Sequence, residues 1–136
     1  YDNTGTNYWN CSVDNPWGIG YKYGGKAYDN YTGNYWSDCV VSDPDGDGIN
    51  NSAYRIHGDA GAQDYRPLVA PWNNYTLVKC GDADCDSYIT LYDSYLVYTR
   101  SMASVWAGDA DCDGFITLYD SYLIYTRNLN CCKCCG

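Results

Sequence analysis

The sequence contains no glutamate, one histidine and one phenylalanine, and its eight lysines and arginines face 17 acidic residues, for a net charge of -9. Phosphate binding needs clustered basic side chains, so we expect no nucleic-acid partner. The lone His57 leaves little for acid–base catalysis near neutral pH, so we expect no enzyme. No apolar run approaches the about 18 residues that cross a bilayer, and we see no signal peptide or initiator methionine. We therefore expect a mature, processed chain without a membrane span.

All 17 acidic residues are aspartates. Glutamate is the usual acid of helices and surfaces, whereas the short aspartate side chain folds back onto nearby backbone groups. The exclusive use of aspartate indicates that the carboxylates bind groups close by in the chain. The alternative is a general compositional bias, which gives the same count of aspartates.

Nine cysteines in a chain of this length are typical of an oxidising compartment, where they form disulfides. Glycosylation sequons support that location. All four lie in the first 76 residues, and their acceptors are Asn10, Asn30, Asn50 and Asn74. The pattern predicts a secreted protein with N-linked glycans.

A first internal repeat relates residues 1–9 to residues 28–36, with six identities in nine positions. Its short aromatic runs, separated by glycine, asparagine and aspartate, predict β-strands joined by tight turns. The shift of 27 residues fits one rung of a β-solenoid. Cys11 and Cys39 occupy equivalent positions in the two copies, so we expect a disulfide between stacked rungs.

A second repeat is stronger, because residues 81–100 and 108–127 are identical at 17 of 20 positions. We divide the chain into a β-rich segment over 1–78, a duplicated domain over 79–130 and a cysteine-rich tail over 131–136. In each copy an aspartate-rich loop precedes a helical pattern in which aliphatic residues share one face. These residues are Ile89, Leu96 and Val97 in the first copy and Ile116, Leu123 and Ile124 in the second. The expected fold class is α+β.

Both duplicated loops carry oxygen ligands at the spacing that calcium prefers. Carboxylates stand at loop positions 1, 3, 5 and 12, a backbone carbonyl at position 7 and a threonine at position 9. In the first loop the carboxylates are Asp82, Asp84, Asp86 and Asp93, the carbonyl is that of Tyr88 and the threonine is Thr90. In the second loop the carboxylates are Asp109, Asp111, Asp113 and Asp120, the carbonyl is that of Phe115 and the threonine is Thr117. Position 6 is Gly114 in the second loop but Ser87 in the first, which predicts strain or weaker binding there. The alternative is a pair of aspartate-capped helices.

An earlier stretch repeats the beginning of this pattern. Asp43, Asp45 and Asp47 occupy positions 1, 3 and 5, and Asn51 stands at position 9. No acid follows at position 12, so the choice is between a calcium turn and an ordinary Asp-Gly turn. We therefore expect two to three calcium ions, and neither copper nor zinc.

The duplicated Asp-x-Asp-x-Asp loop, which ends in aspartate at position 12 and leads straight into a helix, resembles a type I dockerin domain over about residues 80–130. The resemblance implies two calcium ions, two near-symmetric antiparallel helices and docking onto a cohesin domain of a scaffold protein. The partner face that we expect comprises Leu91, Tyr92, Tyr95, Tyr98, Leu118, Tyr119, Tyr122 and Tyr125. The chain departs from the family in the cysteine at position 4 of each loop, the tyrosine-heavy helices and the cysteine-rich tail.

Residues 28–70 resemble the last coils of right-handed β-helix surface proteins of the periplasmic copper-binding type. The resemblance rests on GNYWSD at 33–38, the aspartate turn at 43–49, AYRI at 53–56 and QDYRPL at 63–68. It implies the end of a β-helix and no copper site, because His57 has no histidine partner. Together the two resemblances imply a secreted or cell-surface protein of a prokaryote, and we expect an archaeon.

The dockerin-like resemblance implies that the chain ends are adjacent, with Cys80 and Cys85 near the tail cysteines and Cys112 at the far loop. The connectivity stays open. The tail cysteines are Cys131, Cys132, Cys134 and Cys135. Because nine is odd, one thiol is free or bonds another chain, and we expect Cys112 to be that thiol.

Two rungs are too few to bury a solenoid core, so their strand edges and aromatic side chains need a cover. We expect a non-catalytic, secreted, calcium-binding structural protein that joins copies of itself head to tail into a filament or a cell-surface assembly. One alternative is a dockerin module that binds a cohesin on a separate scaffold. The other is a metal-binding or redox protein that uses the cysteine-rich tail.

Overall fold

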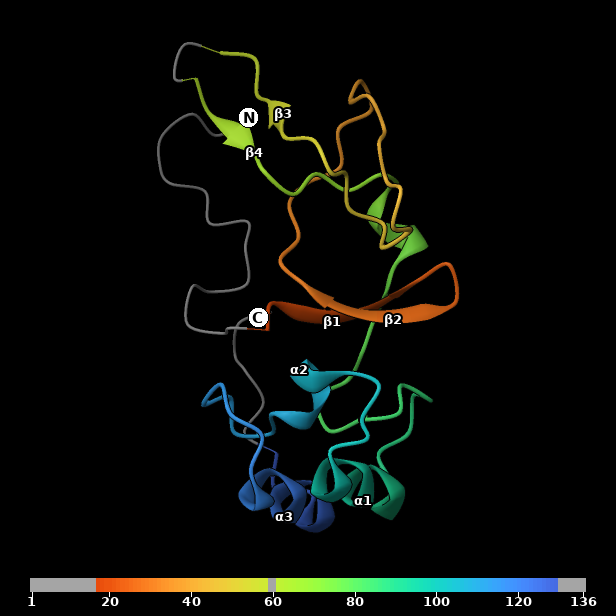
Figure 1. Ribbon diagram of the computed structural model, residues 1–136, viewed down its shortest axis with the longest axis vertical. Coiled ribbons are helices and arrows are strands. Elements are labelled where there is room, and N and C mark those ends of the chain that lie inside the picture. Colours follow the sequence, from red (N-terminus) through yellow and green to blue (C-terminus); the bar gives the residue numbers. More distant parts are fainter. Residues whose placement is uncertain (1–16, 59–60, 130–136) are drawn as a thin grey trace.

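The computed structural model describes residues 17–58 and 61–129. A β-rich part precedes a helical part along the chain, and Figure 1 shows them as two layers with α2 between the sheet and the other two helices. The chain is therefore a mixed α and β protein, in agreement with the expected class. Within the described ranges, no helix has both the length and the apolar character needed to cross a membrane.

The main sheet begins with an antiparallel hairpin of β1 (Ile19–Tyr23) and β2 (Lys26–Asn30). Its two turn residues, Gly24 and Gly25, have φ angles of 57° and 83°. Positive φ at both central residues is the requirement of a type I′ turn, whose twist matches that of the strands. β5 (Thr76–Leu77) pairs antiparallel with the other edge of β1, which gives the strand order β2-β1-β5.

Stacked solenoid rungs are not shown by this arrangement. The second copy of the first repeat contributes the end of β2, which belongs to an antiparallel hairpin. The first copy, at residues 1–9, lies outside the described residues. Among the described residues, the parallel pairing is an isolated bridge between Tyr35 and Leu68.

The segment between β2 and β5 has little regular structure. It contains β3 (Tyr54–Arg55) and β4 (Gln63–Asp64), which pair with each other, and the short 3-10 helix η1 (Trp72–Asn74). The Asp64 carboxylate organises this segment, because it accepts hydrogen bonds from the Asn34 amide at 2.7 Å and the Trp36 indole at 2.9 Å. Carboxylate acceptors make these bonds stronger than neutral ones.

A buried cluster joins this segment to the sheet. It consists of Ile19, Tyr21, Ile49, Leu68 and Tyr75. Tyr21 is fully buried at the centre of the sheet, so its hydroxyl must find a partner inside the protein.

The two long helices, α1 (Leu91–Thr99) and α3 (Leu118–Thr126), begin in the same way. Thr90 and Thr117 are their N-caps, and each forms a capping box with the aspartate three residues later. Both helices end at an arginine in the left-handed conformation, which closes the last turn.

The helices pack through the aliphatic faces that the sequence predicted. Leu96, Val97, Leu123 and Ile124 are buried between them, and Ile89 and Ile116 pack against this cluster. At the crossing point, the Ser94 hydroxyl donates to the Ser121 carbonyl and the Ser121 hydroxyl donates to the Ser94 carbonyl, both at 2.8 Å. These reciprocal bonds between equivalent residues relate the two copies by an approximate two-fold axis.

The sheet and the helical part meet at α2 (Val105–Gly108). The half-buried Asp29 carboxylate of β2 accepts hydrogen bonds from the Ser104 hydroxyl at 2.6 Å and from the Val105 amide at 2.7 Å. Val78, Cys85 and Ala107 form a small buried cluster at the same junction. A strand carboxylate therefore satisfies the open amides at the start of α2.

Candidate metal centres

Three groups of three aspartates bring their carboxylate oxygens within 4.8 Å of one another. The groups are Asp43, Asp45 and Asp47; Asp82, Asp84 and Asp93; and Asp109, Asp111 and Asp120. They are the three loops that the sequence predicted, and each unites residues from positions 1 and 3 with a third acid. Asp86 and Asp113 stand outside these triples and are exposed.

The aspartate at position 1 shapes each duplicated loop by accepting backbone hydrogen bonds. Asp82 accepts from the amides of Asp86 at 3.0 Å and Ser87 at 2.9 Å. The same bonds run to Asp109 from residues 113 and 114 in the second loop. The chain therefore curls around one carboxylate and brings the acid at position 3 beside it.

The aspartate at position 12 connects the loop to the helix. Asp93 is fully buried and accepts from the Ala83 amide at 2.8 Å through one oxygen and from the Thr90 amide at 2.6 Å through the other. Asp120 makes the equivalent bonds to Ala110 and Thr117. One residue thus caps the helix and holds the start of the loop against it.

The predicted ligands at positions 7 and 9 make hydrogen bonds within the loops. The hydroxyls of Thr90 and Thr117 donate to the position-12 carboxylates and accept from a helix amide, so they act as N-caps. The amides of Tyr88 and Phe115 donate to the position-5 carboxylates at 2.8 Å, and their side chains are exposed.

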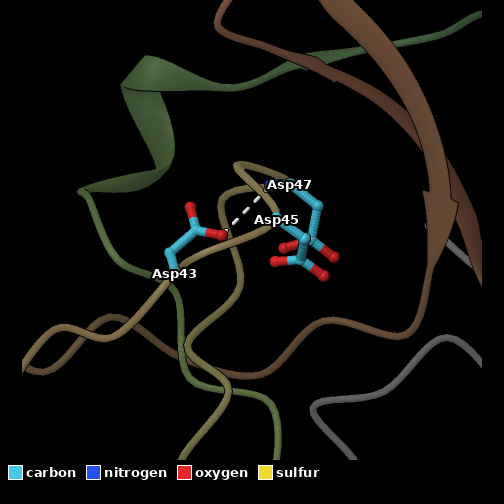
Figure 2. Close-up of side chains that lie close together, drawn as sticks. All are labelled: Asp43, Asp45 and Asp47. Carbon is cyan, nitrogen blue, oxygen red and sulfur yellow. Dashed lines mark hydrogen bonds between the residues drawn. The ribbon is translucent and has the colours of Figure 1, made fainter.

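The third loop has the same local structure although no helix follows it (Figure 2). Asp43 accepts from the amides of Gly46, Asp47 and Gly48 at 2.9 to 3.1 Å. Asp47 accepts from the Ile49 amide at 2.8 Å, as position 5 does in the other loops. This loop therefore forms from its own residues and does not depend on an acid at position 12.

Position 6 is left-handed in all three loops, with φ of 84° at Gly48, 81° at Ser87 and 85° at Gly114. A side chain at such a φ costs about 1–2 kcal/mol. The first loop bears this cost at Ser87, as the sequence predicted.

Three tyrosine hydroxyls hold the third loop against the sheet. Tyr28 donates to the Gly46 carbonyl at 3.0 Å, Tyr21 to the Asp47 carbonyl at 2.8 Å and Tyr75 to the Gly48 carbonyl at 2.5 Å. Three successive carbonyls are thus satisfied by residues from distant parts of the chain. No local pattern in the sequence connects these tyrosines to the loop, so their role is visible only in the folded structure.

A small hollow of about 200 Å³ opens beside the third loop, lined by Asp45, Asp47, Asn51, Tyr65 and Arg66 among others. Asn51, the predicted ligand at position 9, therefore lies on the same side as two of the carboxylates. Arg66 places a positive charge at the edge of this hollow.

Burial raises the pKa of Asp82, Asp109 and Asp47, and the neighbouring carboxylates of each loop raise it further by repulsion. Among the described residues, no lysine or arginine nitrogen lies within 4.0 Å of a carboxylate oxygen, so no ion pair neutralises any of the three triples. Beside the third loop, the charge of Arg66 acts against the rise in the Asp47 pKa.

The cysteines differ from the prediction at three positions. Cys39 is a free thiol, which contradicts a disulfide with Cys11; its sulfur accepts a hydrogen bond from the Asn50 amide nitrogen at 3.0 Å. Cys85 is also free, because it points into the buried cluster beside α2, where burial raises its pKa to about 11. Cys112 is disulfide-bonded, so it is not the unpaired cysteine, and Cys80 is disulfide-bonded as well.

Several predicted sites lie outside the described residues. They are Asn10, Cys11, Cys131, Cys132, Cys134 and Cys135.

The predicted partner face is exposed on both helices. The exposed fractions of its side chains lie between 55% and 67% for Leu91, Tyr92, Tyr95, Tyr98, Leu118, Tyr119, Tyr122 and Tyr125. The Tyr92 and Tyr95 rings stack at 6.2 Å, and Tyr119 and Tyr122 repeat the pair at 6.3 Å. The duplication thus presents two copies of one aromatic surface.

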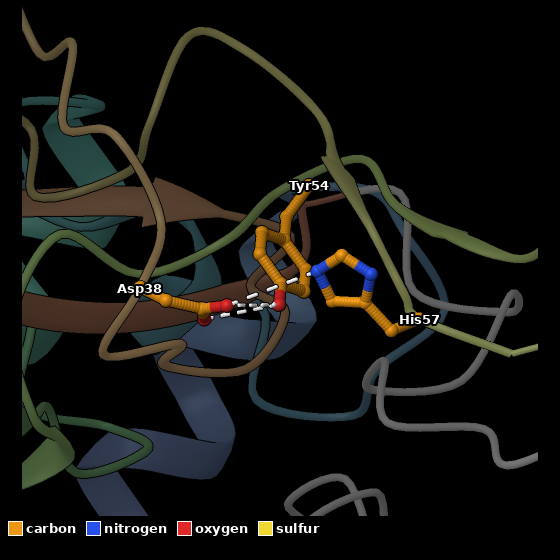
Figure 3. Close-up of polar contacts among 3 residues, drawn as sticks. All are labelled: Asp38, Tyr54 and His57. Carbon is orange, nitrogen blue, oxygen red and sulfur yellow. Dashed lines mark hydrogen bonds and ion pairs between the residues drawn. The ribbon is translucent and has the colours of Figure 1, made fainter.

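His57 lies on the surface, with 83% of its side chain exposed, 3.9 Å from an Asp38 oxygen. The same carboxylate accepts the Tyr54 hydroxyl (Figure 3). Within residues 17–58 and 61–129, His57 thus lies beside one carboxylate at the surface.

No protein-family model matches the chain, and no curated protein or solved structure is detectably similar to it.

Proposed function

We propose that this chain is a non-catalytic, secreted, calcium-binding structural protein whose paired helices dock onto a neighbouring copy in an extracellular assembly. The observation that carries the proposal is the set of three aspartate triples, whose oxygens lie within 4.8 Å of one another and, among the described residues, form no ion pair with lysine or arginine. Packing like charges together costs free energy unless a cation neutralises them.

The donor chemistry favours calcium over softer metals. Every triple offers carboxylate oxygens alone, and calcium takes six to eight such oxygens on flexible loops. Zinc and copper prefer imidazole and thiolate, which are absent from these triples. We propose two ions in the duplicated loops and a third in the loop at 43–51. Three ions change the net charge from -9 to -3.

The exposed aromatic faces support the docking step. Tyrosine is enriched at protein interfaces because its ring buries a large area while its hydroxyl still finds a partner. If these helical faces bind a different surface of the next copy, the same contact repeats from copy to copy and builds a filament. In the same proposal, the 1–9 and 28–36 segments stack on each other, and disulfides stabilise the chain.

Calcium titration of the purified chain, with its disulfides intact, tests the first half. We expect two to three calcium ions per chain by calorimetry, and a fall in thermal stability when a chelator is added. Magnesium is the matched control, because it demands a tighter octahedron and leaves the protein unchanged at equal concentration. Calorimetry without saturable calcium binding would reject the proposal.

Electron microscopy with and without chelator tests the assembly. We expect filaments or ordered oligomers in calcium, and their loss when serine replaces Tyr92 and Tyr119 together. The control replaces Val40, which is 85% exposed on the β part, with serine. Discrete monomers at high protein concentration in calcium would contradict self-assembly.

The second candidate is a dockerin module for a separate scaffold, favoured by the repeated loop-helix unit and its near two-fold symmetry. It predicts a calcium-loaded monomer that binds a purified type I cohesin. A third candidate, metal storage or redox chemistry in the tail, predicts copper, zinc or iron at stoichiometric amounts in elemental analysis.

A further inference from the structure

We propose that Asn74 is an acceptor of an N-linked glycan in the folded protein, whereas Asn30 and Asn50 are structural asparagines that stay unmodified. The three share the same sequon pattern, so the sequence alone does not separate them. The difference lies in what surrounds each amide nitrogen in the folded chain.

Asn50 is 2% exposed and uses its whole side chain inside the protein. Its amide nitrogen donates to the Val40 carbonyl at 2.8 Å and to the Cys39 sulfur at 3.0 Å. Its carbonyl oxygen accepts from the Ser42 amide at 2.9 Å. A sugar on this nitrogen has no space, and it removes a donor from a buried network.

Asn30 is held in a similar way at the end of β2. Its amide nitrogen donates to an Asp47 carboxylate oxygen at 2.9 Å and to the Tyr21 hydroxyl at 3.4 Å. Thr32, the hydroxyl residue of this sequon, is 8% exposed. Both residues that a glycosyltransferase must reach are therefore engaged or covered.

Asn74 is exposed at the end of η1, and so is Thr76, the hydroxyl residue of its sequon. Its amide nitrogen donates to the Pro71 carbonyl at 3.1 Å and to the exposed Asn73 side chain at 3.4 Å. A glycan replaces one of the two hydrogens, so the bond to Pro71 is retained. The modification thus costs one weak surface contact.

The position of η1 is compatible with assembly. Figure 1 shows it on the β part, on the other side of the sheet from α1 and α3. A glycan on Asn74 therefore leaves the aromatic faces of those helices open.

The chemical step is the transfer of a sugar from a lipid-linked pyrophosphate donor, which the transferase supplies. The Asn74 amide nitrogen forms a bond to the anomeric carbon and loses one proton. The bond from that carbon to the phosphate oxygen breaks, and the lipid pyrophosphate leaves with the electron pair. No oxidant or reductant is needed.

Glycopeptide mass spectrometry on the full chain, secreted in its folded form from a host with active N-glycosylation, tests the proposal. We expect a glycan on Asn74 and none on Asn30 or Asn50. Asn74→Gln and Thr76→Ala each remove that glycan, whereas Thr76→Ser retains it. Asn74→Gln leaves the melting temperature unchanged, because the side chain is exposed.

Ala53→Thr gives a matched control, because it completes a sequon that begins at the exposed Asn51, next to the buried Asn50. We expect glycosylation of Asn51 in this variant while Asn50 stays bare. The proposal is overturned if Asn74 carries no glycan in a host that glycosylates a co-expressed control glycoprotein. A glycan on Asn30 or Asn50 in the folded, secreted fraction overturns it as well.

Discussion

The Tyr21 hydroxyl donates a 2.8 Å hydrogen bond to the Asp47 carbonyl, across 26 residues of sequence. Tyr28 and Tyr75 do the same for the carbonyls on either side. A tight turn leaves carbonyls that no ladder or helix satisfies, and a buried carbonyl without a partner is costly. Tyr21 and Tyr28 of the sheet, together with Tyr75 just before β5, therefore supply hydrogen bonds to this turn, and the Gly48 carbonyl also accepts from the Val69 amide.

Tyr21→Phe tests this contribution. The ring stays in place but the Asp47 carbonyl loses its donor, so we expect a loss of about 1–3 kcal/mol in the free energy of unfolding. Urea unfolding measures it, with Tyr65→Phe as the control because Tyr65 is 72% exposed. The control is expected to change stability by less than about 0.5 kcal/mol. Equal effects of the two substitutions would contradict a structural role for the hydroxyl.

Asp84→Asn and Asp93→Asn separate metal binding from capping. Asp84 accepts one amide hydrogen, which an asparagine oxygen also accepts, so we expect no loss of stability in chelator. A small gain there follows from the weaker carboxylate repulsion, and the stabilisation by calcium is smaller. Asp93 also caps α1, so Asp93→Asn lowers stability by about 1 kcal/mol even in chelator. Melting curves with calcium and with chelator measure both effects.

Asp111→Asn is the matched variant in the second loop and is expected to behave as Asp84→Asn does. An equal loss of stability in chelator for Asp84→Asn and Asp93→Asn would show that both residues are purely structural.

The residues at position 6 of the two duplicated loops, serine and glycine, can be exchanged to measure the cost of a side chain there. Ser87→Gly removes a side chain from a φ of 81°, and we expect a gain of about 1 kcal/mol. Gly114→Ser places one at 85° and is expected to cost a similar amount. Urea unfolding of the two variants and of the double variant measures the exchange. A loss of stability in Ser87→Gly would show that the hydroxyl contributes more than the backbone conformation costs.

Asp29 links stability to pH at the junction with α2. Burial raises its pKa, although hydrogen bonds from Ser104 and from the α2 backbone oppose the rise. The folded state therefore binds this proton more tightly than the unfolded state, whose aspartate pKa is about 3.9. The contribution of Asp29 is most favourable below that value and decreases as the pH rises through the folded-state pKa.

The measurement compares the unfolding free energies of the natural chain and Asp29→Asn in chelator. We expect the difference to move against the natural chain as the pH rises above the unfolded-state value of about 3.9, since the asparagine does not titrate. A difference that stays flat as the pH rises would show that the Asp29 pKa is the same in both states.

The duplicated domain was predictable because its information is local. Thr90 and Asp93 lie three residues apart and form the capping box by themselves, and the spacing of Leu96 and Val97 marks the buried face. Loop closure follows from Asp82, whose carboxylate reaches amides four and five residues ahead. Such contacts appear in the sequence as short-range patterns.

The β-rich part was less predictable because its contacts join distant residues. Equivalent positions in the 27-residue repeat suggested a disulfide at Cys39, yet its sulfur lies beside Asn50 and stays free. The odd thiol was assigned to Cys112, whereas Cys39 and Cys85 are the free thiols among the described residues. Cysteine pairing depends on which side chains meet in space, and spacing along the chain does not report that.

By itself, the sequence determined the three aspartate loops, the two helices and which of their faces are buried, because residues within a dozen positions supply the loop and capping hydrogen bonds and the spacing that marks each apolar face. The tertiary structure alone decided which tyrosines bind the third loop, which thiols stay free and which sequon asparagine faces solvent. Those outcomes depend on burial and on hydrogen bonds that form only when the chain folds, so sequons of the same pattern at Asn50 and Asn74 acquire opposite environments.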